Sequence, residues 1–276
     1  MQEGVDLHIH SNWSDGLVSP SRIARDAVKA GLKWICLADH NNINGVEVLC
    51  RRLQRSPVRV IRGVEMTAED GMLGEIHILG YGIDTGSRLL RQALQDIMDR
   101  KWRQICRMVQ GLNDSGMELT PEMVRREAGS GYVGRRALAR LMMRQGYVKN
   151  IYQAFSRYLG EEGSVYVPVG GMRVERVIRL IHDATGIAVL AHPTADMLDE
   201  CIEDYVRWGL DGIEVYRPGT RGNNELYAEM IAEDLGLVTT GGSDWHGRGK
   251  DGPLGSFAVP HTQISDFLEA LELQDQ

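Results

Sequence analysis

Residues 5–10, with the sequence VDLHIH, decide the fold class of this chain of 276 residues. Apolar side chains alternate there with Asp6, His8 and His10, and this period of two is typical of a β-strand. Both histidines therefore lie on one face of the strand. A Ser-Pro helix start at residues 19–20, a helical apolar pattern and an apolar run at residues 34–38 follow. The segment is predicted to form a strand–helix–strand unit.

The alternation of strands and helices continues along the chain. Five more strand candidates bring the predicted total to seven: residues 58–66, 76–81, 187–191, 212–215 and 238–241. Amphipathic helices precede several of them, such as residues 174–184 and 223–234. Repeated β–α units with short connections predict an α/β fold with a parallel sheet, either open or closed into a barrel.

A region of helices alone interrupts this pattern between the fourth and fifth strands. Apolar residues recur there at three- and four-residue spacing, and further helices are expected from Pro121, at residues 135–145 and at residues 150–159. We expect a helical subdomain inserted at residues 87–163. The body, residues 1–86 and 164–276, then has a length near the lower end of the roughly 200 to 400 residues of (β/α) barrels.

The charges of the chain are distributed unevenly. The formal net charge is −7, yet residues 87–163 carry 14 basic and 8 acidic side chains, so the insert has a net charge of +6 and the body one of −13. A basic segment of this kind is either a solvated helical face or a region that handles an anion. We interpret it as a substrate lid for a phosphorylated molecule.

The composition, 43% hydrophobic and 25% charged, is that of a globular protein and excludes a disordered, collagen-like or membrane chain. No apolar run approaches the roughly 18 residues of a membrane helix, and the first ten residues lack the pattern of an export signal. Four scattered cysteines without C-x-x-C spacing favour a reducing compartment. We expect a cytoplasmic protein without membrane contact or an obligate protein partner.

Side chains of the types that bind metals fall at or near the carboxyl ends of six predicted strands. They are His8, His10, Asp15, His40, Glu65, His77, His192, Asp244 and His246. Glu65 is expected at the end of the third strand and His77 within the fourth. In (β/α) barrels this rim carries the active site. Because close carboxylates repel one another unless cations neutralise them, we expect a cluster of cations there.

The donor types indicate which metals such a cluster takes. Imidazole and carboxylate without thiolate suit Mn, Zn or Fe. Nine donors exceed the needs of one ion, so two to three divalent ions are expected, with Glu65 as the carboxylate that bridges a pair about 3.5–4 Å apart. Such a cluster lowers the pKa of bound water from 15.7 to roughly 7, which suits phosphoester hydrolysis.

Six fragments resemble the motifs of the PHP (polymerase and histidinol phosphatase) phosphoesterase family. They are DLHIHSNWSDG (6–16), LADHN (37–41), GVEMT (63–67), HILGYG (77–82), LAHP (190–193) and GGSDWHG (241–247). Their order and spacing cover nearly the whole chain. The resemblance implies a distorted seven-stranded (β/α) barrel with an inserted helical subdomain, in which all nine side chains bind a trinuclear metal cluster.

The insert is similar to that of one branch of the family, the stand-alone nucleoside 3',5'-bisphosphate phosphatases and short-RNA 5'-to-3' exonucleases. Gly134-Arg135, the helix after it and FSRYLG at residues 155–160 carry this resemblance. It implies that Arg135 grips a substrate phosphate through bidentate guanidinium geometry. Arg157 in the insert and Arg217 at the rim are further candidates for phosphate binding.

Two positions depart from the pattern of that branch. Ala137, after an unusual Arg136, stands where the branch often has a histidine, and this bears on the substrate. Asn41 stands where the family usually has an aspartate, and we expect it to affect only the residues around the ligands. Asp39 is expected to orient a ligand.

These observations predict a metal-dependent phosphoesterase. Metal-bound hydroxide is expected to attack a phosphate monoester or terminal phosphodiester of a small nucleotide-type substrate, such as a nucleoside 3',5'-bisphosphate or a short 5'-phosphorylated RNA. The leaving oxygen takes its proton either from a metal-bound water or from His192, Asp244 or His246, and the sequence leaves this choice open. Histidinol-phosphate phosphatase is a second hypothesis. A non-catalytic, metal-stabilised accessory module is a third, disfavoured because no ligand position is lost.

Overall fold

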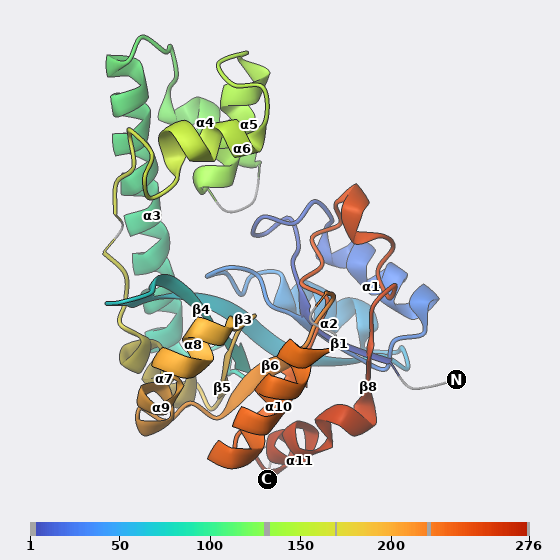
Figure 1. Cartoon of the computed structure of the whole chain (residues 1–276). Helices are drawn as coiled ribbons and strands as arrows, with labels where there is room; N and C mark the ends of the chain where they lie inside the picture. Colours follow the sequence, from blue (N-terminus) through green and yellow to red (C-terminus); the bar gives the residue numbers. More distant parts are fainter. Residues whose placement is uncertain (1–3, 130–132, 169, 220–221, 275–276) are drawn as a thin grey trace. The chain divides into compact units, whose positions relative to one another are not determined.

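The computed structural model describes residues 4–129, 133–168, 170–219 and 222–274. The chain divides into two compact units (Figure 1). The larger comprises Met1–Leu94 and Gly171–Gln276, and the smaller comprises Gln95–Gly170. Among the described residues, no helix is both long and apolar enough to span a membrane.

The larger unit is built on one eight-stranded sheet with the strand order β7-β6-β5-β4-β3-β2-β1-β8. Its strands are β1 (Gly4–Ile9), β2 (Trp34–Leu37), β3 (Arg59–Asp70), β4 (Gly74–Tyr81), β5 (Ile187–Leu190), β6 (Gly212–Tyr216), β7 (Val238–Gly241) and β8 (Val259–Pro260). The pairs β1–β2, β2–β3, β5–β6 and β6–β7 are parallel. The pairs β3–β4, β4–β5 and β1–β8 are antiparallel.

The segment after β7 returns to β1 and brings the two ends of the sheet together. Trp245 forms a parallel bridge with Ile9. The backbone carbonyl of Trp245 accepts from the amide of His10 at 2.8 Å, and its amide donates to the carbonyl of His8 at 3.3 Å. The sheet is therefore a nearly closed barrel, and the mixed α/β class is confirmed.

Two details of the expected sheet were wrong. The structure has an eighth strand, β8, which at two residues is too short to show a periodic pattern. The sheet is also not wholly parallel, because β4 runs opposite to both of its neighbours. A turn of three residues joins β3 to β4, and the Asp70 carboxylate closes it by accepting from the amides of Met72 at 2.8 Å and Leu73 at 2.9 Å. Because a connection between parallel strands needs a dozen or more residues, a turn this short allows only an antiparallel pair.

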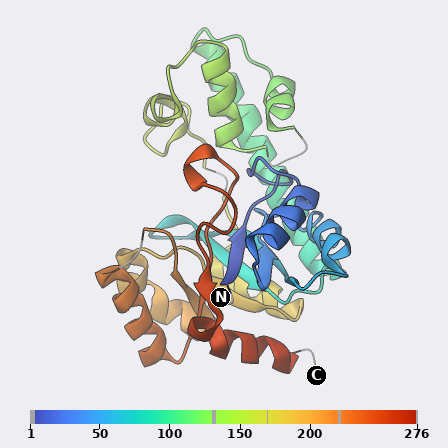
Figure 2. The ribbon, with the colours of Figure 1, turned by 90° about the vertical axis from the view of Figure 1, so that its right-hand side faces the viewer.

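Helices cover the sheet of the larger unit. They are α1 (Pro20–Ala30), α2 (Val46–Leu53), α7 (Val174–Asp183), α8 (Ala195–Glu200), α9 (Ile202–Arg207), α10 (Asn223–Leu235) and α11 (Ser265–Gln274). The blue helices α1 and α2 lie on the opposite side of this unit from the orange helix α10 (Figure 2). Ile23 of α1 and Leu49 of α2 are fully buried in one cluster with Ile35 and Leu37 of β2. Burial of this apolar face fixes the strand ends that carry the site.

The smaller unit is helical and has its own core. Helix α3 (Arg88–Asp114) begins before the division at Leu94 and is followed by α4 (Pro121–Ala128), α5 (Arg135–Arg144), α6 (Ile151–Ala154) and the π-helix η1 (Phe155–Leu159). The hydroxyl of Thr120 accepts from the amide of Met123 at 3.2 Å and so caps the start of α4. The core includes Met108, Leu112, Leu138 and Leu141, all fully buried.

Candidate metal centre

The sheet brings the nine predicted ligands to one place in the larger unit. His8 lies in β1, and His10 follows that strand directly; His40, His192 and the pair Asp244 and His246 follow β2, β5 and β7. Glu65 was expected at the end of its strand but lies in the middle of β3, because the hairpin with β4 extends β3 to Asp70. That hairpin also places His77 of β4 opposite Thr67 of β3.

Glu65 is the hub of this cluster. Its side chain is buried, and its two oxygens lie within 3.4 Å of a nitrogen of each of five histidines. The distances from Oε2 are 3.4, 3.3 and 2.9 Å to His8 Nε2, His10 Nε2 and His40 Nδ1, and those from Oε1 are 3.0 and 2.9 Å to His77 Nδ1 and His192 Nε2. A carboxylate in this position has both oxygens available to two different cations.

The two aspartates extend the cluster from Glu65. Asp15 Oδ1 lies 2.9 Å from His246 Nε2 and 3.7 Å from His40 Nε2. Asp244 Oδ1 lies 3.1 Å from His10 Nε2. Three overlapping groups have donor atoms close enough to hold an ion each: His10 with Asp15, His40 and His246; His8 with His10 and Glu65; and His40 with Glu65 and His77.

Unsatisfied atoms at the centre of the cluster test whether metal ions fit. His8 Nε2, His10 Nε2 and Glu65 Oε2 are buried and make no hydrogen bond within the described part of the chain. A buried polar atom without a partner costs about 1–3 kcal/mol. The two imidazole nitrogens lie 3.4 and 3.3 Å from Glu65 Oε2, and all three atoms are of types that bind metal ions. A cation between them would satisfy all three, so the residues fit a metal cluster.

Charges and burial shift the pKa values of the cluster in both directions: those of Glu65 and His10 fall, whereas the charge of Glu65 outweighs burial and raises the pKa of His77 to about 9. Burial alone would raise the pKa of Glu65, but the charges of His40, His77 and His8 outweigh burial and hold this pKa well below its usual range. Burial and the charge of His246 lower the pKa of His10 to about 4. An ionised carboxylate and a neutral imidazole are the forms that coordinate a metal.

Glu214, in the middle of β6, supports two of the histidines. It is 1% exposed, and its Oε1 accepts from Nδ1 of His8 at 2.7 Å while its Oε2 accepts from the backbone amide of His192 at 2.8 Å. The six family motifs do not include Glu214, and its buried position excludes an ordinary solvated charge. A lone carboxylate within the otherwise apolar strand GIEVY was the available signal.

Two other buried carboxylates hold the loops of the site. Asp6 accepts from the amide of Ser243 at 2.8 Å and from its hydroxyl at 2.6 Å, which ties the loop after β7 to β1. Asp39 accepts from the amide and hydroxyl of Ser11 and from the hydroxyl of Ser14. Burial raises the pKa of each carboxyl to about 6. Asp39 therefore contacts two serines, and Ser14 in turn lies 3.4 Å from His10 Nδ1.

Two of the candidate ligands have a strained backbone. His192 has φ +35° and Asp244 has φ +51°, backbone angles that residues other than glycine rarely adopt. Such strain persists only where surrounding contacts enforce it, and it clusters at functional sites. The bond from the His192 amide to Glu214 and the Asp244 carbonyl, which accepts from Nδ1 of His246 at 2.7 Å, supply these contacts.

Comparison with known proteins places the chain in a family. Residues 6–166 match the model of the PHP domain. A 5'-3' exoribonuclease from Haemophilus influenzae is 31% identical over 89% of this chain and 91% of its own length. The chain belongs to the PHP family. This confirms the resemblance found in the motifs.

Other PHP relatives carry different names. A phosphoribosyl 1,2-cyclic phosphate 1,2-diphosphodiesterase from Eggerthella lenta is 27% identical over 92% of this chain and 98% of its own. A 3',5'-nucleoside bisphosphate phosphatase from Chromobacterium violaceum is 27% identical over 90% of this chain and 89% of its own. A crystal structure from Bifidobacterium adolescentis, described as a metal-dependent phosphoesterase, has a TM-score of 0.85 and 26% identity and covers 96% of both chains.

The predicted phosphate-binding arginines lie in different parts of this PHP protein. Arg217 follows β6 in the larger unit and donates from Nη2 to the carbonyl of Pro193 at 3.3 Å. Arg135 begins α5 of the smaller unit, with its guanidinium carbon 5.5 Å from the centre of the Tyr166 ring. Arg157 is exposed on the π-helix of the same unit. Arg221, another arginine that follows β6 in the sequence, lies outside the described residues.

The two departures from the family pattern have structural counterparts. Ala137 is 1% exposed and belongs to the core of the smaller unit, so a larger polar side chain there would have to displace its neighbours. Asn41 has φ +51°, where Asn is among the favoured residues. Its amide donates to the hydroxyl of Thr67 at 2.8 Å, and its oxygen accepts from the Thr67 amide at 2.9 Å. Asn41 thus joins the loop after β2 to β3.

Proposed function

We propose that this protein is a metal-dependent phosphoesterase that hydrolyses a phosphate monoester or terminal phosphodiester of a nucleotide-type substrate. The observation that supports the proposal is that seven of the nine predicted ligands form three overlapping groups of N and O donors that share Glu65, His10 and His40. Within these groups, buried atoms of His8, His10 and Glu65 make no hydrogen bond in the described structure. Nucleoside 3',5'-bisphosphates and short 5'-phosphorylated RNAs are the substrates that we favour. Relatives named 5'-3' exoribonuclease and 3',5'-nucleoside bisphosphate phosphatase match this chain over about nine-tenths of its length and support this choice.

The nine side chains would hold two to three divalent ions of Mn, Zn or Fe. When bound, such ions act as Lewis acids that acidify water and neutralise the charge on phosphoryl oxygens. The protein keeps the donors in place through Asp6, Asp39 and Glu214, whose contacts fix the loops and one imidazole ring. Fixed donors of this kind supply the positioning that displacement at phosphorus requires.

The proton for the leaving oxygen would come from a group that substrate can reach. Among the three candidate side chains, Asp244 is 46% exposed, His192 is 29% exposed and His246 is 9% exposed. Both nitrogens of His246 are already engaged, by the Asp15 carboxylate and the Asp244 carbonyl. The hydrogen bond from His10 and the charge of His8 outweigh burial and hold the pKa of Asp244 well below its usual range, so this carboxylate has no proton to donate. We therefore favour His192 over His246 and Asp244.

The basic segment at residues 87–163 would serve as the substrate lid, with Arg135 binding a phosphate that does not react. The local net charge of +6 in an otherwise acidic chain supports this role. The rings of Phe155 and Tyr166, whose centres lie 5.9 and 5.5 Å from the Arg135 guanidinium carbon, hold this side chain in position. Arg157 would add charge to the same lid.

A second candidate activity is hydrolysis of a cyclic phosphoribosyl phosphate. The relative from Eggerthella lenta that carries this name matches 98% of its own length. The same metal cluster would serve this reaction. The two candidate activities therefore differ in the organic part of the substrate that the protein recognises.

A substrate screen on metal-loaded protein tests the proposal. The panel comprises a nucleoside 3',5'-bisphosphate, a 5'-phosphorylated oligoribonucleotide, phosphoribosyl 1,2-cyclic phosphate and histidinol phosphate. We expect the highest kcat/KM on one of the first two. A preference for histidinol phosphate would overturn the substrate class, and a lack of hydrolysis on the whole panel with metals bound would overturn the activity.

The proposed location is the cytoplasm. All four cysteines are free thiols, two of them buried, as expected in a reducing compartment.

A further inference from the structure

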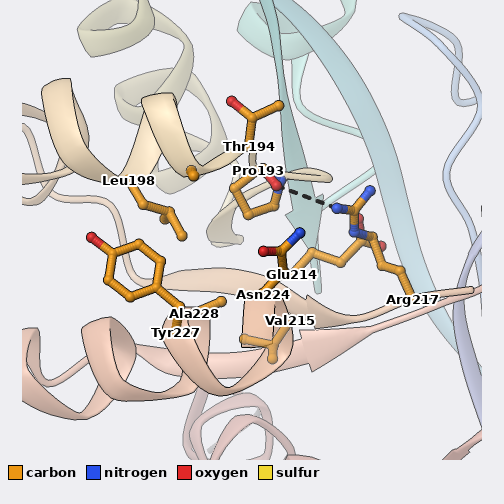
Figure 3. A pocket seen from close by; sticks show the side chains of 10 residues that line it. Pro193, Thr194, Leu198, Glu214, Val215, Arg217, Asn224, Tyr227 and Ala228 are labelled. Carbon is orange, nitrogen blue, oxygen red and sulfur yellow. Dashed lines mark hydrogen bonds between the residues drawn. The ribbon is translucent and has the colours of Figure 1, made fainter. Parts of the chain in front are cut away.

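A pocket of about 220 Å³ lies in the larger unit at the carboxyl ends of β5 and β6 (Figure 3). The loop and helix after β5, the end of β6 and the first turns of α10 form it. Its lining residues are Pro193, Thr194, Ala195, Leu198, Glu214, Val215, Arg217, Asn224, Tyr227 and Ala228. The carboxyl ends of the strands are the rim where (β/α) barrels place their active sites.

Two residues connect this pocket directly to the metal centre. Glu214 lines the pocket, and its carboxylate binds Nδ1 of His8 and the amide of His192. Pro193 also lines the pocket and follows His192 in the chain. Arg217 closes this side by donating to the Pro193 carbonyl, the dashed line in Figure 3. A group bound in the pocket would therefore lie beside the His192 edge of the cluster.

The lining is apolar at one end and polar at the other. In Figure 3, Leu198 and the Tyr227 ring lie toward one end and Arg217 toward the other, with Asn224 between them. The hydroxyl of Tyr227 donates to Asp199, which fixes the ring. Apolar and aromatic walls with a few fixed polar groups are the usual lining of small-molecule sites. An aromatic face suits the stacking of a nucleobase.

The size of the pocket and the charges of its lining restrict which part of a substrate it can bind. The volume is below the roughly 300–1,000 Å³ of pockets for drug-sized ligands, so it suits one ring system rather than an oligonucleotide. The Glu214 carboxylate and the Arg217 guanidinium both line the pocket, so their charges offset each other and the lining has no net positive charge to attract a second phosphate. A neutral base with polar edges needs no such charge.

We propose that this pocket binds the nucleoside part of the substrate while the metal centre holds the phosphate that reacts. This assignment rests on the proposed phosphoesterase function for the role of the phosphate. It makes Tyr227 and Leu198 specificity-determining residues, and Asn224 and Arg217 the groups that read the polar edge of the base or sugar.

Binding of two probes to the metal-loaded protein tests this assignment. Adenosine monophosphate contains both parts of the ligand, and inorganic phosphate contains only the part for the metal centre. Ala195→Phe fills the pocket from an exposed position, so the variant should fold normally. Glu200→Phe adds the same ring at the other end of α8, at an exposed position outside the lining, and is the matched control.

By calorimetric titration we expect Ala195→Phe to weaken the binding of adenosine monophosphate at least tenfold and to leave that of phosphate within twofold of the wild type. Tyr227→Ala should weaken adenosine monophosphate by about 5- to 100-fold through loss of the ring face. Glu200→Phe should bind both probes like the wild type. Unchanged nucleotide binding in both pocket variants, or equal losses for both probes, would overturn the assignment.

Two further outcomes separate this proposal from the proposed function and from another occupant. If the wild-type protein hydrolyses nucleotides and both pocket variants keep the wild-type KM, the function stands and the pocket assignment fails. If the wild type hydrolyses no phosphoester yet loses adenosine monophosphate binding on Ala195→Phe, the pocket assignment stands and the function fails. If Ala195→Phe weakens adenosine 3',5'-bisphosphate but not the monophosphate, the pocket holds a second phosphate and the nucleoside assignment is overturned.

Discussion

Nδ1 of His8 lies 2.7 Å from Oε1 of Glu214, a residue 206 positions further along the chain. A carboxylate only accepts, so Nδ1 carries the proton and Nε2 is the free nitrogen of this ring. Nε2 is also the atom that faces Glu65 at 3.4 Å and Asp244 at 3.6 Å. Glu214 therefore fixes both the tautomer and the direction of a proposed metal ligand, as carboxylates behind metal-bound histidines do.

Glu214→Gln tests this relationship. A glutamine has one acceptor oxygen, so it cannot accept from both His8 and the His192 amide, and its NH₂ would face one of these donors. We expect metal affinity to fall by about 10- to 100-fold, measured by competition with a chromophoric chelator. Glu203→Gln, at an exposed position, is the control. Equal affinity in the two variants would contradict the positioning role.

Arg135→Ala tests the phosphate-binding role in the smaller unit. If Arg135 binds a phosphate that does not react, kcat/KM on a nucleoside 3',5'-bisphosphate should fall by roughly 10- to 100-fold, because a charge-assisted hydrogen bond is worth about 1.5–3 kcal/mol. Hydrolysis of a simple aryl phosphate should change by less than about threefold. Arg107→Ala, an exposed arginine of α3, is the control. Equal losses on both substrates would count against the role.

Asn41 offers a test of stability at a departure from the family pattern. Asn41→Ala removes two hydrogen bonds and leaves the amide of buried Thr67 without its acceptor. We expect the free energy of unfolding to drop by about 2–4 kcal/mol, from this loss and from the left-handed backbone. Asn41→Asp keeps an acceptor for that amide, and the Thr67 hydroxyl can donate to it, so the loss should be smaller. Urea unfolding compares the two, and an equal or larger loss for Asn41→Asp would show that these bonds are not what stabilises the site.

His182 on α7 should give the protein a measurable pH dependence. Its side chain is 39% exposed, and its Nε2 lies 2.7 Å from Oδ2 of Asp211. The hydrogen bond with Asp211 raises the pKa of His182 above its ordinary value of about 6.5. The stabilisation is therefore complete below about pH 6.5 and lost as the pH rises through the folded-state pKa.

His182→Gln should accordingly lower Tm more at pH 5.5 than at pH 9, by about 1–3 °C for a pair this exposed. His261→Gln, at another exposed histidine, should show no such difference. A difference between the wild type and His182→Gln that stays constant with pH would rule out the linkage.

Seven of the eight strands could be predicted from sequence, because each is a short apolar run bounded by turn or helix-capping residues. The start of β1 and the ends of α1, at Pro20 and Gly31, follow directly from such signals. The direction of β4 could not be predicted from periodicity, because a strand has the same pattern in both directions. The short turn that the Asp70 carboxylate closes sets the direction of β4, and the small number of residues between the two strands was the sequence signal for it.

The residue types of the metal centre could also be predicted, because several His, Asp and Glu side chains fall at strand ends that meet at one rim of a barrel. The supports were harder to foresee. Asp39 and Glu214 differ from other acids only in the partners that the fold brings to them, Ser11 and Ser14 for one and His8 for the other. Such pairs join residues 25 to 206 positions apart, and no local pattern encodes them.

The most direct test of the account is hydrolysis of adenosine 3',5'-bisphosphate as the metal content is varied. Protein stripped by a chelator and reloaded with Mn²⁺ or Zn²⁺ is assayed in parallel with elemental analysis of the same samples. We predict no activity without metal, and activity that rises to a maximum at two to three ions per chain. Fully loaded protein that hydrolyses no phosphoester, or activity that is unaffected by removal of the metal, would contradict the central claim.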